Sequence, residues 1–234
     1  MLQPENNTGT QHLSHDNIDM ATQGYHTIQH HLFVLYDLFL HKYENIRESW
    51  FLKGRRRDSE IQSFIRNTGL TPDVMVNHIK RGFTKVEMSL SRQEWIAIIL
   101  LLDQVPRHIF RGSPQSYKYD AIAKSIVKRA YHLRIHTYIT IDELMFLVLP
   151  LMHSERLRDH ELAHLMLDEY EIHQHVMGYP IRNDTYEGDV MKTTRYHLFE
   201  HTKVIQRFGR YPKRYKKRTA EEERYISQNT KRMY

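Results

Sequence analysis

The chain has 234 residues, of which 40% are hydrophobic and 11% aromatic, which is enough for one full-sized core of a soluble globular protein. It has no cysteine, which excludes disulfides and thiolate chemistry, and no apolar run reaches the ~20 residues that a membrane span needs. The net charge is +6, but residues 203–234 hold eleven Lys or Arg against three Glu, a balance of +8, so the rest sums to −2. We expect a cytoplasmic protein without membrane contact, because the polar N-terminus carries no export signal.

Apolar spacing predicts an all-α protein of about eight to ten helices in antiparallel pairs, since strand patterns are nearly absent. Residues 1–21 are rich in Asn, Gln, Thr and His, and we expect a disordered N-terminal tail there. A single helical domain should follow over residues 22–212, and a basic segment over residues 213–234. Within the domain, the first helix is expected over about residues 25–43 and a loop over residues 44–57.

Two capping boxes, Ser91 with Glu94 and Thr140 with Glu143, open the two most apolar helices. Gly178 should end the long helix that Ser154 caps. The later helices are expected at about residues 59–68, 72–79, 92–104, 114–130, 141–149, 155–177 and 190–207.

The stretch that organises the chain is a helix whose residues 95–102 are all apolar, as in helices buried on every side. Pro106 should end this helix near position 104, because a proline disfavours the α conformation of the preceding residue. Leu100 and Leu101 should be fully buried. Asp103 should pair with an arginine, either Arg107 or one from the segment 207–210.

Ten polar residues from three separate blocks form the candidate site. Arginine forks suit the two oxygens of a carboxylate or phosphate. We therefore expect a pocket that binds an anionic small molecule through Asp103, Gln104, Arg107, Arg111, Ser154, Glu155, Arg207 and Arg210. The alternative is a hydrolase or transferase in which His153 and His201 supply acid–base catalysis. A purely structural network of ion pairs between helix ends would use the same residues, so the question of enzymatic activity stays open.

Two spacings match zinc-binding patterns: residues 160–164 (HELAH) and residues 197–201 (HLFEH). Seventeen histidines raise the background rate of accidental matches, to somewhat under ~0.1 per chain for each pattern. His160 and His164 also share a polar stripe with Asp168, which is typical of a solvated helix face. We therefore expect surface histidines, and neither a metal nor a cofactor.

Basic residues alternate with tyrosines near the C-terminus, a composition that can follow phosphates and stack on bases. A nucleic-acid partner would bind through Lys213, Arg214, Lys216, Lys217 and Arg218. Truncation after Pro212 should then abolish binding and leave the helical core folded. The alternative is a solvated basic tail. The oligomeric state is not predicted.

Three blocks resemble one known family when they are taken together: residues 100–112 (LLLDQVPRHIFRG), residues 149–155 (LPLMHSE), and His201 followed by residues 204–212 (VIQRFGRYP). They resemble the domain-of-unknown-function 924 family, which also has an aromatic pair like Trp50-Phe51 and a late pair like Glu222-Glu223. The resemblance covers about residues 30–226. It implies an all-helical fold similar to tetratricopeptide helix pairs, and no known activity, because the family is uncharacterised.

The chain departs from the family pattern at the rim of the candidate site. Residues 213–215 (KRY) stand where the family has His-Arg-Asn. His108 replaces an Asn and His160 replaces a Gln. The resemblance therefore implies a shared core site with a different C-terminal rim.

Overall fold

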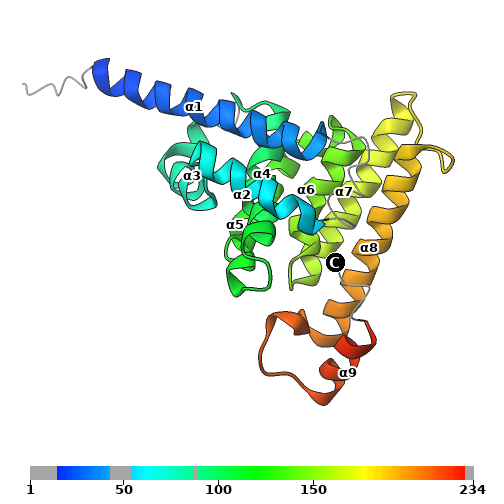
Figure 1. The fold of residues 1–234 in the computed structure, drawn as a ribbon. Coiled ribbons are helices and arrows are strands. Elements are labelled where there is room, and N and C mark those ends of the chain that lie inside the picture. The colour runs from blue at the N-terminus through cyan, green and yellow to red at the C-terminus, as the bar shows by residue number, and fades with distance from the viewer. Residues whose placement is uncertain (1–14, 43–53, 87–88, 230–234) are drawn as a thin grey trace, which may run out of the picture.

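A computed structural model describes residues 15–42, 54–86 and 89–229 of the chain. These ranges contain nine α-helices and no strand (Figure 1). The helices are α1 (His15–Leu40), α2 (Gly54–Thr68), α3 (Pro72–Val86), α4 (Arg92–Ile109), α5 (Asp120–His132), α6 (Ile141–Met152), α7 (Leu157–Val176), α8 (Tyr186–Phe208) and α9 (Ala220–Gln228). The expected all-α class and helix number are confirmed, while the tetratricopeptide-like arrangement stays a prediction.

The core forms around α4, which packs against α1, α2, α3, α5 and α6. The apolar run predicts this position, because a helix without a polar face must be covered on all sides. Leu100 and Leu101 are both fully buried, which confirms the expectation for them. The second apolar helix, α6, packs against α4, α5, α7 and α8 and continues the core toward the α7–α8 pair.

Local capping chemistry starts both core helices where the sequence predicts it. Ser91 Oγ accepts from the Glu94 backbone N–H at 3.2 Å, and Glu94 Oε2 accepts from the Ser91 N–H at 2.7 Å. The same reciprocal pair joins Thr140 and Glu143 at the start of α6. Each box satisfies two backbone donors that a helix start leaves without partners.

Pro106 does not end α4, so the expected stop near position 104 is wrong. The helix continues to Ile109, and the Phe110 N–H bonds to the Pro106 carbonyl. Proline removes one backbone donor but leaves the carbonyls of the next turn available as acceptors. Pro150 lies inside α6 in the same way. Burial on all sides holds both helices together across the missing hydrogen bond.

Two boundaries near the N-terminus also differ from the expectation. The first helix begins at His15 and not near residue 25, so residues 15–21 are helical. The basic residues 55–57 lie in the first turn of α2 and not in a loop. Arg57 is buried, and its guanidinium bonds to Glu60 at 2.9 Å. The composition shows that these stretches are polar, but it cannot show that Arg57 becomes buried in the fold. The rest of the expected loop lies outside the described residues.

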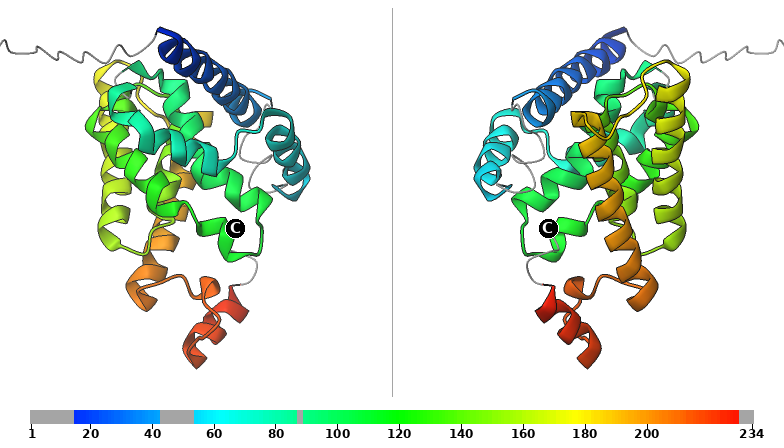
Figure 2. Two further views of the ribbon diagram at one scale, coloured as in Figure 1. Left: turned by 90° about the vertical axis from the view of Figure 1, so that its left-hand side faces the viewer. Right: turned by 90° about the vertical axis from the view of Figure 1, so that its right-hand side faces the viewer.

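The chain ends in a small unit beyond the main helical body. The long helices α7 and α8 pack side by side, and α9 lies past the C-terminal end of α8 in both views of Figure 2. A separate apolar cluster of Val204, Ile205 and Tyr211, with Phe208 and Tyr225 against it, joins this end of α8 to α9. Among the described residues, no helix is long and apolar enough to cross a membrane.

Candidate functional site

Asp103 is the buried centre of the candidate site. Its carboxylate is fully enclosed and contacts three polar side chains. Gln104 Nε2 donates to Oδ2 at 2.5 Å, while Arg107 Nη1 lies 3.1 Å and His153 Nδ1 lies 2.9 Å from Oδ1. Burial opposes ionisation, but Arg107 and His153 outweigh it and lower the pKa of Asp103 to about 2. The carboxylate is therefore ionised at neutral pH, and its expected pairing with Arg107 is confirmed.

The ion pairs continue from α4 to two further elements. Arg107 Nη2 lies 2.9 Å from Asp120 Oδ1 at the start of α5, and Arg214 Nη2 lies 3.3 Å from Asp120 Oδ2. Arg214 comes from the short 3-10 helix Pro212–Arg214 and also donates to the His153 carbonyl at 2.9 Å. Its guanidinium lies over the rings of Tyr117 and Tyr211, 4.4 and 4.8 Å from their centroids. The C-terminal segment thus reaches back onto the site.

Hydrogen bonding sets the tautomer of His153, which caps the end of α6. Because the Asp103 carboxylate can only accept, His153 Nδ1 carries the proton and Nε2 has a lone pair. No hydrogen bond to Nε2 occurs within the described parts of the chain. Burial and then Arg107 lower the pKa of His153, against the opposing effect of Asp103. The ring is therefore neutral at neutral pH.

His201 of α8 is the second histidine at the site, with its ring centroid 6.2 Å from that of His153. His201 Nδ1 lies 3.0 Å from the Tyr211 hydroxyl, which itself donates to the Met152 carbonyl. The hydroxyl can therefore only accept from Nδ1, which leaves the lone pair of His201 on Nε2. Burial, followed by His153, lowers the pKa of His201 to about 3. Two neutral imidazoles thus lie side by side.

Glu155 and Ser154 hold the turn between α6 and α7 in place. Glu155 accepts from the Tyr211 N–H at 2.8 Å and from the Tyr215 hydroxyl at 2.7 Å. Ser154 Oγ donates to Asp159 at 2.5 Å. Lys124 and Lys128 lie 2.8 and 2.5 Å from the same carboxylate. Burial opposes ionisation of Asp159, but these hydrogen bonds outweigh it and lower its pKa to about 2.

The other candidate arginines lie apart from Asp103, each on a carboxylate of its own. Arg111 Nε and Nη2 form a fork on Asp58 at 2.9 and 2.7 Å. Arg210 forms a second fork on Glu222 at 2.8 and 2.9 Å. Arg207 contacts Glu221 at 2.7 Å near α9. The structure therefore brings together Asp103, Gln104, Arg107, His153 and His201, with Ser154 and Glu155 beside them.

The surface assignment of His160 is wrong. Its ring is fully enclosed, with Nε2 2.8 Å from the Ser154 carbonyl and Nδ1 3.0 Å from Thr202 Oγ1. The stripe pattern fails here because α8 covers the first turn of α7, while Asp168 further along the stripe is exposed. Within the described ranges, no group of three or more His, Asp or Glu is placed to hold a metal.

The basic C-terminal residues have different environments. Arg214 is part of the site, and Arg218 bonds to the Pro212 carbonyl at 2.9 Å and to Glu223 at 3.2 Å. Lys213 is half-buried, whereas Lys216 and Lys217 are exposed. A nucleic-acid partner stays a prediction that rests on the exposed lysines.

Sequence reasoning missed Asp120, Tyr117 and Asp159 as members of the site. No local pattern marks Asp120, because its role depends on α5 beginning beside the end of α4. Tyr211 stands in the block 204–212 and Arg214 in the basic run, and nothing in their spacing links them to Asp103. The available signal was the group of arginines and tyrosines directly after α8, because their long side chains can bond to groups on neighbouring elements.

The fold and site define a class: an all-helical protein in which helix ends meet at a buried Asp–His–Arg cluster. The chain belongs to the family described as "Bacterial protein of unknown function (DUF924)", whose model matches residues 34–230. It is similar in structure to the protein of unknown function ATU0120 from Agrobacterium tumefaciens, with a TM-score of 0.58 and 21% sequence identity over 90% of this chain and 99% of that one. At that identity the likeness concerns the fold alone. No curated protein matches the chain.

Proposed function

We propose that the Asp103–His153 pair is the acid–base centre of a hydrolase or transferase. The observation that carries this proposal is the 2.9 Å contact of His153 Nδ1 with a buried carboxylate, which directs the ring's lone pair to Nε2. A carboxylate that orients a histidine and stabilises its protonated form is a recurring arrangement in general base catalysis. The lowered pKa of His153 keeps the base unprotonated at neutral pH.

Other groups at the site support the same role. Arg214 holds the His153 backbone carbonyl, and Arg107 contacts the same Asp103 oxygen as His153 does. These contacts fix the position of the Asp103–His153 pair. His201 would take part in proton transfer beside His153, since its free nitrogen is also Nε2.

Simple capture of an anion at this position has less support. It was inferred from an excess of arginines, but each arginine of the site contacts a carboxylate: Arg107 both Asp103 and Asp120, and Arg214 Asp120. Ion pairs of this kind neutralise the cations that an anion would need. The proposal therefore assigns the chemistry to His153 and makes the arginines supporting groups.

A panel of chromogenic carboxylic and phosphate esters tests the proposal with wild-type protein and His153→Gln. Loss of a general base should lower turnover by about 10²–10⁴-fold. His41→Gln is the matched control, because His41 forms an Asp–His pair of 2.8 Å with Asp37 on the surface. Turnover equal in wild type and His153→Gln would contradict the proposal. So would an NMR spectrum that places the neutral ring's proton on Nε2 of His153.

A further inference from the structure

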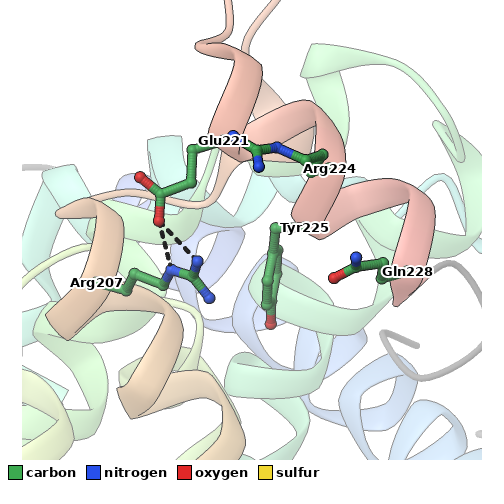
Figure 3. Close-up of a pocket in the computed structure, with 5 residues that line it drawn as sticks. All are labelled: Arg207, Glu221, Arg224, Tyr225 and Gln228. Carbon is green, nitrogen blue, oxygen red and sulfur yellow. Dashed lines mark hydrogen bonds and ion pairs between the residues drawn. The ribbon is translucent and has the colours of Figure 1, made fainter.

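A cavity of about 310 Å³ lies away from Asp103, at the junction of α8 and α9 (Figure 3). Its volume is at the lower end of the range of small-molecule sites, roughly 300–1,000 Å³. The residues that line it are Arg207, Glu221, Arg224, Tyr225 and Gln228. Four of these five carry hydrogen-bond donors, and two are arginines.

The walls of the cavity are held by contacts outside it. The Thr219–Glu222 capping box starts α9, and the fork of Arg210 on Glu222 ties this helix to the end of α8. The hydrogen bond from Arg210 lowers the pKa of Glu222 to about 2, so the fork persists over the physiological range. The ring of Tyr225, which lines the cavity, packs on Phe208 with centroids 5.1 Å apart. These contacts fix α9, which carries four of the five lining residues, against the end of α8.

Arg207 is oriented before any ligand arrives. Its Nε and Nη2 lie 2.8 and 2.7 Å from one oxygen of Glu221, and its guanidinium lies over the Phe208 and Tyr225 rings at 5.0 and 5.7 Å. These contacts leave Nη1 without a partner among the described residues. The ion pair with Glu221 leaves Nη1 of Arg207 available as a donor to a ligand.

Three further donors at the cavity are also without partners. The side chains of Arg224, Tyr225 and Gln228 make no hydrogen bond or ion pair within the part of the chain that the structure describes. In Figure 3 Arg207 and Gln228 stand on either side of the Tyr225 ring. Glu221 is the one carboxylate in the lining, and Arg207 already engages it. The lining therefore carries two cations against one anion.

We propose that this cavity binds the phosphate or carboxylate group of a small molecule. Arg224 and Nη1 of Arg207 supply charged donors, and the Tyr225 hydroxyl and Gln228 amide supply neutral ones. Guanidinium groups bind such oxyanions through short, charge-assisted hydrogen bonds. The arginine excess that the sequence suggested for the end of α4 thus occurs here, where Arg224 has no carboxylate partner among the described residues.

Isothermal titration at low ionic strength, with inorganic phosphate and with succinate, tests the proposal and separates the two kinds of oxyanion. Arg224→Gln should weaken binding of the preferred anion by about tenfold or more, the effect of losing one charged hydrogen bond. Tyr225→Phe should weaken it severalfold, because the hydroxyl donor is lost. The ring that packs on Phe208 stays, so the fold should not change. Arg66→Gln is the matched control, since Arg66 is an exposed arginine near the end of α2.

Each outcome decides the question. Binding of phosphate or succinate that Arg224→Gln weakens and Arg66→Gln leaves within about twofold supports the site. Equal weakening in both variants would show unspecific attraction to a basic protein and would overturn it. No heat of binding for either anion up to about 10 mM would also overturn it, since weaker sites have no use at cellular concentrations. None of these variants touches His153, so the result is independent of the proposed acid–base centre.

Discussion

At the scale of single residues, the buried carboxylate of Asp103 holds one amide, one arginine and one histidine in place. A carboxylate enclosed in this way is stable only while its partners remain, because burial by itself disfavours the charge. Its partners come from α4 and from the end of α6, so the carboxylate also joins two core helices.

Asp103→Asn should destabilise the fold by about 3 kcal/mol, because it leaves Arg107 with less counter-charge in a buried position. Urea unfolding measures the change. Asp184→Asn is the matched control: Asp184 pairs with Arg182, but its side chain is 67% exposed. The control should leave the free energy of unfolding almost unchanged, because solvent screens an exposed ion pair. Equal destabilisation by both variants would mean that the buried contacts of Asp103 contribute no more stability than an exposed ion pair.

Because the pKa of Asp103 is low, the free energy of unfolding also depends on pH under acidic conditions. The pKa is lowered from 3.8 to about 2, so the folded protein holds the ionised form more strongly than the unfolded chain does. The contribution, about 2 kcal/mol, is complete above pH 3.8 and disappears as the pH falls toward 2. Unfolding curves of Asp103→Asn should therefore approach those of wild type at the acid end of this window.

His201 produces a second dependence at higher pH. Its pKa is lowered from 6.5 to about 3, so the unfolded chain binds the proton first as the pH falls. The free energy of unfolding should decrease between pH 6.5 and 3, with up to about 1.4 kcal/mol per pH unit from this one group. In His201→Gln, one proton fewer binds on unfolding, so the free energy of unfolding should depend less steeply on pH over this range. An NMR titration in which His201 protonates near pH 6.5 would contradict the assignment.

At the scale of helices, α4 carries the core because its apolar residues face every neighbour. Leu101→Ala should cost about 2–5 kcal/mol through lost burial and the cavity that remains. Leu165→Ala is the same change at a side chain that is 44% exposed on α7, and it should cost far less. Thermal unfolding of both variants separates the two cases. Equal losses would mean that neighbouring side chains move in to fill the cavity left by Leu101→Ala.

The start of α8 depends on a glycine for a reason that the sequence does not reveal. A Cβ on Gly188 would lie 1.9 Å from the carbonyl oxygen of Arg182, which is a backbone atom and cannot rotate away. Gly188→Ala should therefore shift the loop before α8 and cost about 1–3 kcal/mol in urea unfolding. Lys192→Ala, at an exposed position of α8, should leave stability within about 0.5 kcal/mol.

At the scale of the whole molecule, the C-terminal segment closes back onto the helical body. Arg214 bonds to the His153 carbonyl, and Tyr211 contacts both Glu155 and His201. Of these contacts, only that of Arg214 lies beyond Pro212, so the expectation that a chain ending at Pro212 keeps its folded core stays a prediction. Exposed Lys216 and Lys217 can still meet a partner, but the segment also stabilises the site.

Ending the chain at Pro212 should lower the melting temperature, because it removes Arg214 and Glu222 and uncovers the apolar cluster around Val204. Ending it at Asn229 keeps all of these contacts and is the control. Differential scanning calorimetry of the two truncated chains compares them directly. Equal melting temperatures would show that the C-terminal unit adds nothing to the stability of the main body.

The sequence by itself determined the helical class, the buried helix α4, both capping boxes and the pairing of Asp103 with an arginine. These features depend on residues at most a few positions apart, so spacing and local chemistry are sufficient to predict them. It also located three of the blocks that meet at the site, because costly polar groups next to apolar runs must find partners.

Only the tertiary structure decided which partners these are. His153 reaches Asp103 from the end of α6, Asp120 of α5 reaches Arg107, and Arg214 of the C-terminal segment reaches Asp120. No local pattern encodes contacts between residues so far apart in the chain. The same limit explains the errors: burial from all sides carried α4 past Pro106, and α8 covered the face of α7 that holds His160. Burial depends on what the rest of the chain places opposite a residue, and that is settled when the helices pack.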